Sequence, residues 1–269
     1  MHPFRAMTFN VNGQARFGWE RRASVCGKVM EESHPDIVGF QEFGVTNWET
    51  FSDHLPYFDI YYGLEAGDIF INPIAWDKNR YHCREAHTQW LSETPHVYSK
   101  GWDGSERGVS WVVLEDCSAE RVILFLNVHL DNKGEKARIE GTRQMLTIIG
   151  QYPNSLPTII TGDFNCSPHL PHDTSSYTRK PYDMLVDAGF CDSWSDVNPE
   201  TAQVPHTFHG YQGEEYVADQ FGTWHTDWIM VRSIKTLQHE IIRKAEDVTF
   251  PSDHYPVVSL LEYTAESAA

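Results

Sequence analysis

The stretch PTIITGDFNCSP, residues 157–168, begins like a buried strand and ends in a group of polar residues. Thr158–Thr161 is rich in β-branched residues, which favour strands. Asp163 and Asn165 follow two residues apart, with Phe164 between them. Because side chains alternate between the two faces of an extended segment, both polar side chains point one way while Phe164 points back into the core. The stretch therefore predicts a strand that delivers two polar groups to one point.

Polar residues at the ends of strand-like runs recur elsewhere in the chain. They are Asn10 in TFNVNG, Glu42 in GFQEFG, His129 in NVHLD, Asp227 in HTDWIMV, and Asp253 with His254 in PSDHYPV. A lone carboxylate inside a strand is costly unless it is paired or bound to a metal. We therefore expect these groups to converge on a shared mouth at the ends of two sheets.

The rest of the chain supplies the strands for such an arrangement. Strand-like runs lie at 7–11, 37–41, 58–62, 69–76, 86–91, 108–114, 122–129, 158–161, 226–231, 235–242 and 255–260, and helix-like stretches at 17–34, 135–150 and 180–190. Several runs follow one another with no helix between them, which argues against a doubly wound parallel sheet. We expect an α/β protein of antiparallel or mixed sheets packed face to face, with helices outside. No linker or repeat interrupts residues 1–269, so a single domain is the default.

The charge of the chain bears on its partners. Only 21 Lys and Arg residues face 38 Asp and Glu residues, giving a formal net charge of −17. Proteins that track many phosphates of a polymer usually present a basic face, so extended nucleic acid is disfavoured, though a local basic patch remains compatible with this charge. Solubility or adaptation to high salt explains the acidity equally well.

Cysteine usage and hydropathy bear on location. The five cysteines are odd in number and form no CxxC pair, which suggests reduced thiols in a cytoplasm. No run approaches the roughly 18 uninterrupted apolar residues of a membrane helix, so no membrane partner is expected. The N-terminal MHPFRAMTFNV enters a strand almost at once, which leaves no room for a signal peptide.

The chemistry of the strand-end residues is coherent. Glu42, Asp253 and Asn10 offer hard oxygen ligands suited to Mg²⁺ or Mn²⁺ rather than zinc. Asp163, with Asn165 beside it, could orient and deprotonate an attacking water.

Two histidines complete the set. His129 and His254 can donate to phosphate oxygens, and a buried Asp227 could fix the tautomer of His254. A hard cation, two histidine donors and a carboxylate base suit hydrolysis of a phosphoester by in-line displacement at phosphorus.

In this order the motifs resemble the endonuclease/exonuclease/phosphatase superfamily, the DNase I-like proteins, over residues 8–258. The middle segments resemble its microbial metal-dependent hydrolases. The resemblance implies a four-layer α/β sandwich with two mixed, mainly antiparallel sheets. It also implies metal binding by Glu42 with Asn10 and Asp253, phosphate contact by His129, water activation by Asp163 with Asn165, and an Asp227–His254 pair. Asn12 departs from the abasic-site endonucleases, which carry Asp there, so a second metal carboxylate is in doubt.

Other residues are candidates for substrate contact. Arg107, Asn132 and Arg138 could reach a phosphate, although Arg138 could equally be an exposed helix arginine paired with Glu135 or Glu140. Trp102 and Trp224 could stack on a base or sugar ring, and the loops at 207–215 and 219–225 could form a lid. The histidines 206, 209 and 225 lack cysteine partners or an HExxH spacing, so they are poor zinc ligands.

The sequence thus predicts a Mg²⁺- or Mn²⁺-dependent hydrolase of a compact, soluble phosphate monoester or diester, such as a nucleotide, sugar phosphate or inositol phosphate. A nuclease that cleaves DNA or RNA by the same chemistry is the alternative enzyme. A non-catalytic scaffold that kept the fold is the alternative outside enzymes. The oligomeric state is left open.

Overall fold

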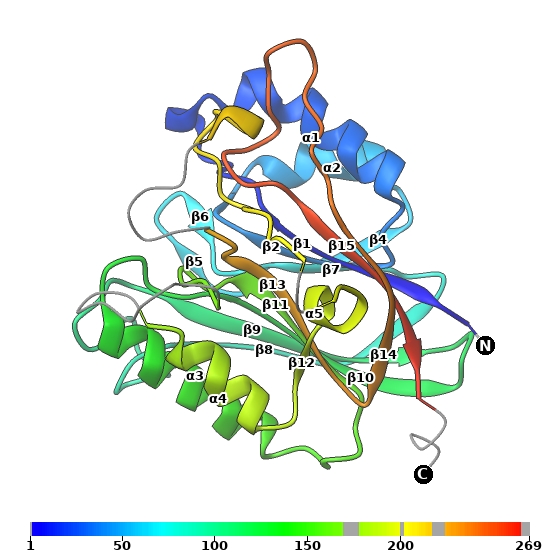
Figure 1. Ribbon diagram of the computed structural model, residues 1–269, viewed down its shortest axis with the longest axis vertical. Coiled ribbons are helices and arrows are strands. Elements are labelled where there is room, and N and C mark those ends of the chain that lie inside the picture. The colour runs from blue at the N-terminus through cyan, green and yellow to red at the C-terminus, as the bar shows by residue number, and fades with distance from the viewer. Residues whose placement is uncertain (1, 169–177, 200–201, 217–223, 265–269) are drawn as a thin grey trace.

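The computed structural model describes residues 2–168, 178–199, 202–216 and 224–264. Two six-stranded sheets lie face to face, and helices cover their outer faces (Figure 1). The first sheet has the order β14 (Ile234–Ile241), β15 (Val257–Tyr263), β1 (Phe4–Asn10), β2 (Ile37–Gln41), β7 (Ile74–Asp77) and β4 (Phe58–Tyr61). The second has the order β12 (Cys191–Asp192), β13 (Asp227–Arg232), β11 (Thr158–Asp163), β10 (Arg121–His129), β9 (Gly108–Asp116) and β8 (Tyr81–Trp90).

Smaller elements complete the described chain. A three-stranded sheet has the order β3 (Phe43–Gly44), β6 (Ile69–Phe70) and β5 (Glu65–Ala66). The helices are α1 (Trp19–Ser33), α2 (Asn47–His54), α3 (Glu135–Ile149), α4 (Lys180–Asp187) and the short α5 (Ser193–Val197), with 3₁₀ turns at Ala15–Phe17 and Gly213–Glu215. The helices of the described residues are too short or too polar to span a lipid bilayer.

Hydrophobic residues form three layers of core. The central layer joins the facing sides of the two sheets and includes Ile37, Phe125 and Ile229. A second layer packs α1 and α2 onto the outer face of the first sheet, and a third packs α3 and α4 onto the outer face of the second. The mixed-sheet sandwich expected from the sequence is confirmed.

Each large sheet contains one parallel strand pair among its described strands. β1 runs parallel to β2, with α1 as the crossover, and β10 runs parallel to β11, with α3 as the crossover. The carboxyl ends of both strands of such a pair lie at the same edge of the sheet. Asn10 is therefore level with Gln41, and His129 with Asp163.

One predicted strand is wrong in its extent. The run at 69–76 divides into β6 and β7, which belong to different sheets. The break lies at Asn72, whose φ of 48° is left-handed, followed by Pro73, which has no N–H to donate to a ladder. The Asn72 side chain donates to the Gly108 carbonyl at 2.6 Å, which fixes the turn.

A buried polar bridge joins the two sheets near their polar ends. Gln41 Nε2 donates to Asn127 Oδ1 at 2.7 Å, and Asn127 Nδ2 donates to the carbonyls of Phe40 at 2.7 Å and Pro73 at 2.9 Å. We call this the Gln41–Asn127 bridge. Gly39 lets the sheets approach here, because a Cβ on it would lie 2.6 Å from Asn127 Oδ1.

We expect Asn127→Ala to lower the free energy of unfolding by about 3 kcal/mol, because it removes three buried hydrogen bonds that each contribute about 1 kcal/mol. Urea unfolding measures the change. Asn154→Ala, at an exposed position, is the matched control and should stay within about 0.5 kcal/mol of the parent. Equal stabilities of the two variants would contradict a structural role for the bridge.

Candidate active site

The predicted polar residues gather around one cavity of about 340 Å³. Its lining comprises Glu42, Arg107, His129, Asn132, Asp163, Asn165, Phe208, Trp224, Thr226, Asp253 and His254. Asn10 and Asp227 lie directly behind this lining, almost fully buried, and contact it through hydrogen bonds.

Strand topology explains the convergence. β11 ends at Asp163, which is level with Asp227 at the start of the antiparallel β13. β15 is antiparallel to β1, so the segment that precedes it, with Asp253 and His254, lies near the end of β1. Phe164 is fully buried and stacks on Trp228 with ring centroids 4.2 Å apart, as the alternation predicted.

The backbone is unusual at three of these strand ends. Asn12, Glu42 and Asn165 have φ values of 45°, 50° and 49°, a left-handed conformation that is uncommon for residues other than glycine. Such conformations cost of order 1 kcal/mol or more and persist where the surroundings hold them. The strain therefore coincides with the cavity.

His254 lies between two carboxylates. Its Nδ1 is 2.9 Å from Asp227 Oδ2, and its Nε2 is 3.7 Å from Asp163 Oδ2. Burial opposes the charged imidazolium, but Asp227 and Asp163 outweigh it and raise the pKa of His254 well above its usual value. Thr226 donates to the same Asp227 oxygen at 3.1 Å. The predicted Asp227–His254 pair is present.

The pKa values of Asp163 and His129 both differ from those of exposed side chains, and in opposite directions. Burial raises the pKa of Asp163, against the influence of His254, which lowers it. Burial, with smaller contributions from Arg107 and His254, lowers the pKa of His129 well below its usual value. His129 Nε2 lies 3.4 Å from Asp163 Oδ2. A neutral His129 thus stands beside a buried carboxyl.

The contacts of Asn10 differ from the metal-ligand role predicted for it. Its Nδ2 donates to Glu42 Oε1 at 3.2 Å and to Asp163 Oδ2 at 3.1 Å, while its Oδ1 accepts from the Asn12 amide at 3.1 Å. An amide nitrogen has no lone pair for a cation. Asn10 therefore orients the two carboxylates in this geometry.

The donor set fits a hard cation. Glu42 and Asp253 both line the cavity, and carboxylate oxygens are the ligands that Mg²⁺ and Mn²⁺ prefer. Asp163, Asp227 and His254 also have ligand atoms within 4.8 Å of one another, but their hydrogen bond and ion pairs account for that proximity. We regard Glu42 and Asp253 as the side chains that would hold a metal.

Among the predicted substrate residues, Arg107 and Asn132 line the cavity and Arg138 does not. Arg138 is fully buried in α3, where it donates to the Asp131 carbonyl at 2.8 Å and pairs with Glu135 at 2.5 Å. The predicted substrate contact of Arg138 is therefore wrong. The alternative, an exposed helix arginine paired with Glu135 or Glu140, is right about Glu135 and wrong about exposure. The helix crossover turns this side chain inward.

The structure adds residues that the sequence did not single out. Phe208 faces His254 edge-on, with ring centroids 5.0 Å apart, and Thr226 holds Asp227. Trp224 lines the cavity, whereas Trp102 is not among its lining residues. No local pattern indicates that Phe208, among the aromatic residues of the loops, would face His254. The proposed lid lies partly at residues 219–223, outside the described residues.

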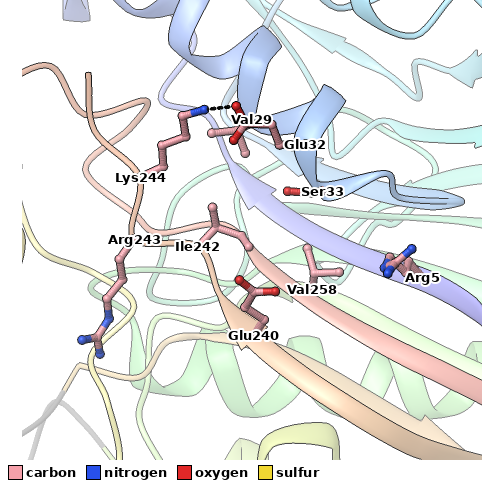
Figure 2. Close-up of a pocket in the computed structure, with 9 residues that line it drawn as sticks. All are labelled: Arg5, Val29, Glu32, Ser33, Glu240, Ile242, Arg243, Lys244 and Val258. Carbon is pink, nitrogen blue, oxygen red and sulfur yellow. Dashed lines mark hydrogen bonds and ion pairs between the residues drawn. The ribbon is translucent and has the colours of Figure 1, made fainter. Parts of the chain in front are cut away.

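Another hollow lies on the outer side of the first sheet, between α1, β1 and β14–β15 (Figure 2). Its Lys244 pairs with Glu32, and its Arg243 lies 3.4 Å from Glu214. None of its lining residues belongs to the polar strand ends. The three histidines 206, 209 and 225 likewise form no metal-like group among the described residues.

Asp131 fixes the loop that carries Arg107. Its carboxylate accepts from the Ser105 amide at 2.7 Å and hydroxyl at 2.6 Å, and from the amides of Lys133 at 2.8 Å and Gly134 at 2.6 Å. Burial opposes the charged form, but these hydrogen bonds outweigh it and lower the pKa of Asp131 to about 2. The loop before Arg107 and the loop before α3 are thereby held together.

Comparisons with known proteins agree with this geometry. The model of the endonuclease/exonuclease/phosphatase family matches residues 7–254. An uncharacterised protein of Acanthamoeba polyphaga mimivirus is 25% identical over 177 residues, which span 62% of this chain and 66% of the viral protein.

Two solved structures from Bacteroides thetaiotaomicron are each 26% identical to the chain. A protein of the endonuclease/exonuclease/phosphatase family superposes with a TM-score of 0.80, covering 98% of this chain and 100% of that one. A mannosyl-6-phosphatase superposes with a TM-score of 0.76, covering 97% and 100%.

We expect Asp131→Asn to lower the free energy of unfolding by about 2 kcal/mol at pH 7, since a carboxyl pKa about 2 units below its unfolded value contributes that much. A depressed pKa stabilises the fold above the unfolded pKa, and the contribution is lost as pH falls. The gap between parent and variant should therefore close between about pH 4 and about pH 2. Urea unfolding across this range measures it, with the exposed Asp53→Asn as control. A gap independent of pH would contradict this role.

Proposed function

Since the chain belongs to the endonuclease/exonuclease/phosphatase family, we propose that it is a divalent-metal-dependent hydrolase of compact, soluble phosphoesters. The observation that carries the proposal is the cavity beside Glu42 and Asp253, where His254 is hydrogen-bonded to Asp227 and forms an ion pair with Asp163. The mannosyl-6-phosphatase among the structural relatives supports a compact substrate. The cysteines, which are unpaired, support a cytoplasmic location.

Each side chain has a defined part in this proposal. Asp163 accepts the proton of the attacking water, a task that its raised pKa suits. His254 stays an imidazolium, because Asp227 and Asp163 flank it, and stabilises the negative charge on the phosphoryl oxygens in the transition state. This assigns His254 to electrostatic stabilisation and Asp163 to the base.

The remaining groups orient the reactants. His129 is neutral and donates a hydrogen bond to a phosphoryl oxygen. Asn10 donates hydrogen bonds to Glu42 and Asp163 and so fixes their relative positions. The backbone amide of Asn165 donates to Asp163 Oδ1 at 3.0 Å and fixes the rotamer of the base. A Mg²⁺ or Mn²⁺ held by Glu42 and Asp253 would supply Lewis-acid stabilisation of the phosphoryl oxygens and leaving group.

The charge of the protein favours small substrates over a polymer. The formal net charge is −17, and Arg107 is the one Arg or Lys among the described residues that line the cavity. A nucleic-acid groove needs several such contacts. Nuclease action remains the alternative, recognised by degradation of DNA or RNA with a steep salt dependence.

We expect Asp163→Asn to lower kcat by ~10²–10⁴-fold on phosphoesters in the presence of Mg²⁺ or Mn²⁺, the contribution of a positioned general base. Steady-state hydrolysis of a panel of nucleotides, sugar phosphates and inositol phosphates measures it. Asp183→Asn, on the exposed face of α4, is the matched control and should retain full activity. Turnover in EDTA equal to that with metal would overturn the mechanism.

Thermal unfolding separates metal binding from catalysis. Mg²⁺ at 100 times its Kd should stabilise the folded protein by about 2.7 kcal/mol. Glu42→Gln should abolish most of this stabilisation, because it removes a ligand charge, whereas Asp163→Asn should keep it. If neither metal shifts the unfolding temperature of the parent and no ester is hydrolysed, a non-catalytic scaffold is the better description.

A further inference from the structure

We infer that the site selects phosphate monoesters over diesters, with Arg107 and Asn132 binding the unesterified oxygens of a dianionic phosphoryl group. The inference rests on the proposed function and adds a substrate class to it. Four features carry it: the place of Arg107, the rigidity of its loop, the state of its hydrogen-bond donors and the charges that surround it.

Arg107 is part of the cavity lining. It immediately precedes β9, and its carbonyl accepts from the Leu91 amide at 2.7 Å, so its backbone is part of the sheet edge. It lines the cavity together with His129 and Asn132. A cation at this position is close enough to His129 to influence its charge state.

The loop before Arg107 is held rigidly. Asp131 accepts from both the amide and the hydroxyl of Ser105 and from two amides at the start of α3, as described above. Gly104 fits against this carboxylate, since a Cβ on it would lie 2.6 Å from Asp131 Cγ. Asp103 Oδ1 also accepts a hydrogen bond from the Ala137 amide at 2.8 Å. A fixed loop gives a preorganised cation, which loses little entropy on binding.

The guanidinium of Arg107 makes few and long hydrogen bonds within the protein. Its Nε is buried without a hydrogen-bond partner and lies 3.8 Å from Asp131 Oδ2, beyond hydrogen-bond distance. Its Nη2 reaches Asn132 Oδ1 at 3.5 Å, the outer limit for such a bond. Guanidinium has five donors in a planar fork that matches phosphate geometry. Arg107 therefore has donors available for an anion.

A dianionic ligand needs a cation beside it in this acidic cavity. The cavity is lined by the carboxyl side chains Glu42, Asp163 and Asp253, and Asp227 lies behind them. A monoester dianion brings one negative charge more than a diester, and Arg107 is the side chain that matches it. In a diester an ester arm replaces one charged oxygen, which leaves the half-buried guanidinium without that partner.

The alternative is that Arg107 has only a structural role, in which case its ion pair with Asp131 would be what holds it in this position. That carboxylate already accepts four hydrogen bonds from other groups, and the pair is 3.8 Å apart. The two descriptions differ in what a variant does to substrate preference.

The test compares p-nitrophenyl phosphate with methyl p-nitrophenyl phosphate, which share a leaving group and differ by one methyl ester. We expect the parent, with Mg²⁺ or Mn²⁺, to have the higher kcat/KM on the monoester. Arg107→Gln should lower kcat/KM on the monoester by roughly 10- to 100-fold, the loss expected for a charged hydrogen bond. It should leave the diester nearly unchanged, so the preference disappears.

Two further variants make the result decisive. Arg107→Lys keeps the charge but loses the fork, and should retain part of the monoester preference. Arg121→Gln removes a cation at the other end of β10 from His129 and should leave both activities unaltered. Thermal unfolding of every variant, with and without inorganic phosphate, shows whether the fold is intact and whether phosphate binding weakens in Arg107→Gln alone.

A diester preference of the parent, or an equal loss on both esters in Arg107→Gln, would overturn the inference. In those cases hydrolysis persists in the parent, and the proposed function stands. If the parent hydrolyses neither these esters nor the panel above, the proposed function fails, and the substrate class fails with it.

Discussion

The Gln41–Asn127 bridge is the contact on which the rest of the structure depends. It ties the end of β2 in one sheet to β10 in the other, one residue before Glu42 and two before His129. Two sheets that pack only through apolar residues can slide against each other at little cost, whereas a buried hydrogen bond fixes one register. The bridge therefore sets how the halves of the cavity face one another.

Two parallel strand pairs account for the composition of that cavity. β1–β2 delivers Asn10 and Glu42, and β10–β11 delivers His129 and Asp163, each pair through its own crossover helix. The antiparallel neighbours β13 and β15 return to the same edge, bringing in Asp227 and the segment with His254. Acidic groups from four strands meet there, and their mutual repulsion creates the need for cations. His254 meets part of this need, and the proposed metal and Arg107 would meet more.

Burial and neighbouring charges shift the pKa values of the converging groups in different directions. Asp163 and His254 lie close together, yet the pKa of each is raised, the first by desolvation and the second by the carboxylates that flank it. His129, beside Arg107, is shifted the other way and stays neutral. A carboxyl with a raised pKa, an imidazolium and a neutral imidazole thus arise from ordinary side chains through their surroundings alone.

Alternation and periodicity determined much of this protein from the sequence alone. The β-branched run before Asp163, the inward Phe164 and the recurrence of polar strand ends were sufficient for most of the long strands, the mixed-sheet class and most of the polar cavity residues, because these patterns depend on local geometry. Tertiary structure decided what local geometry leaves free. The crossover turned Arg138 inward, the register turned the Asn10 amide nitrogen towards two carboxylates, and loop packing brought Phe208 to His254. Each depends on contacts between residues far apart in the chain, which no local pattern records.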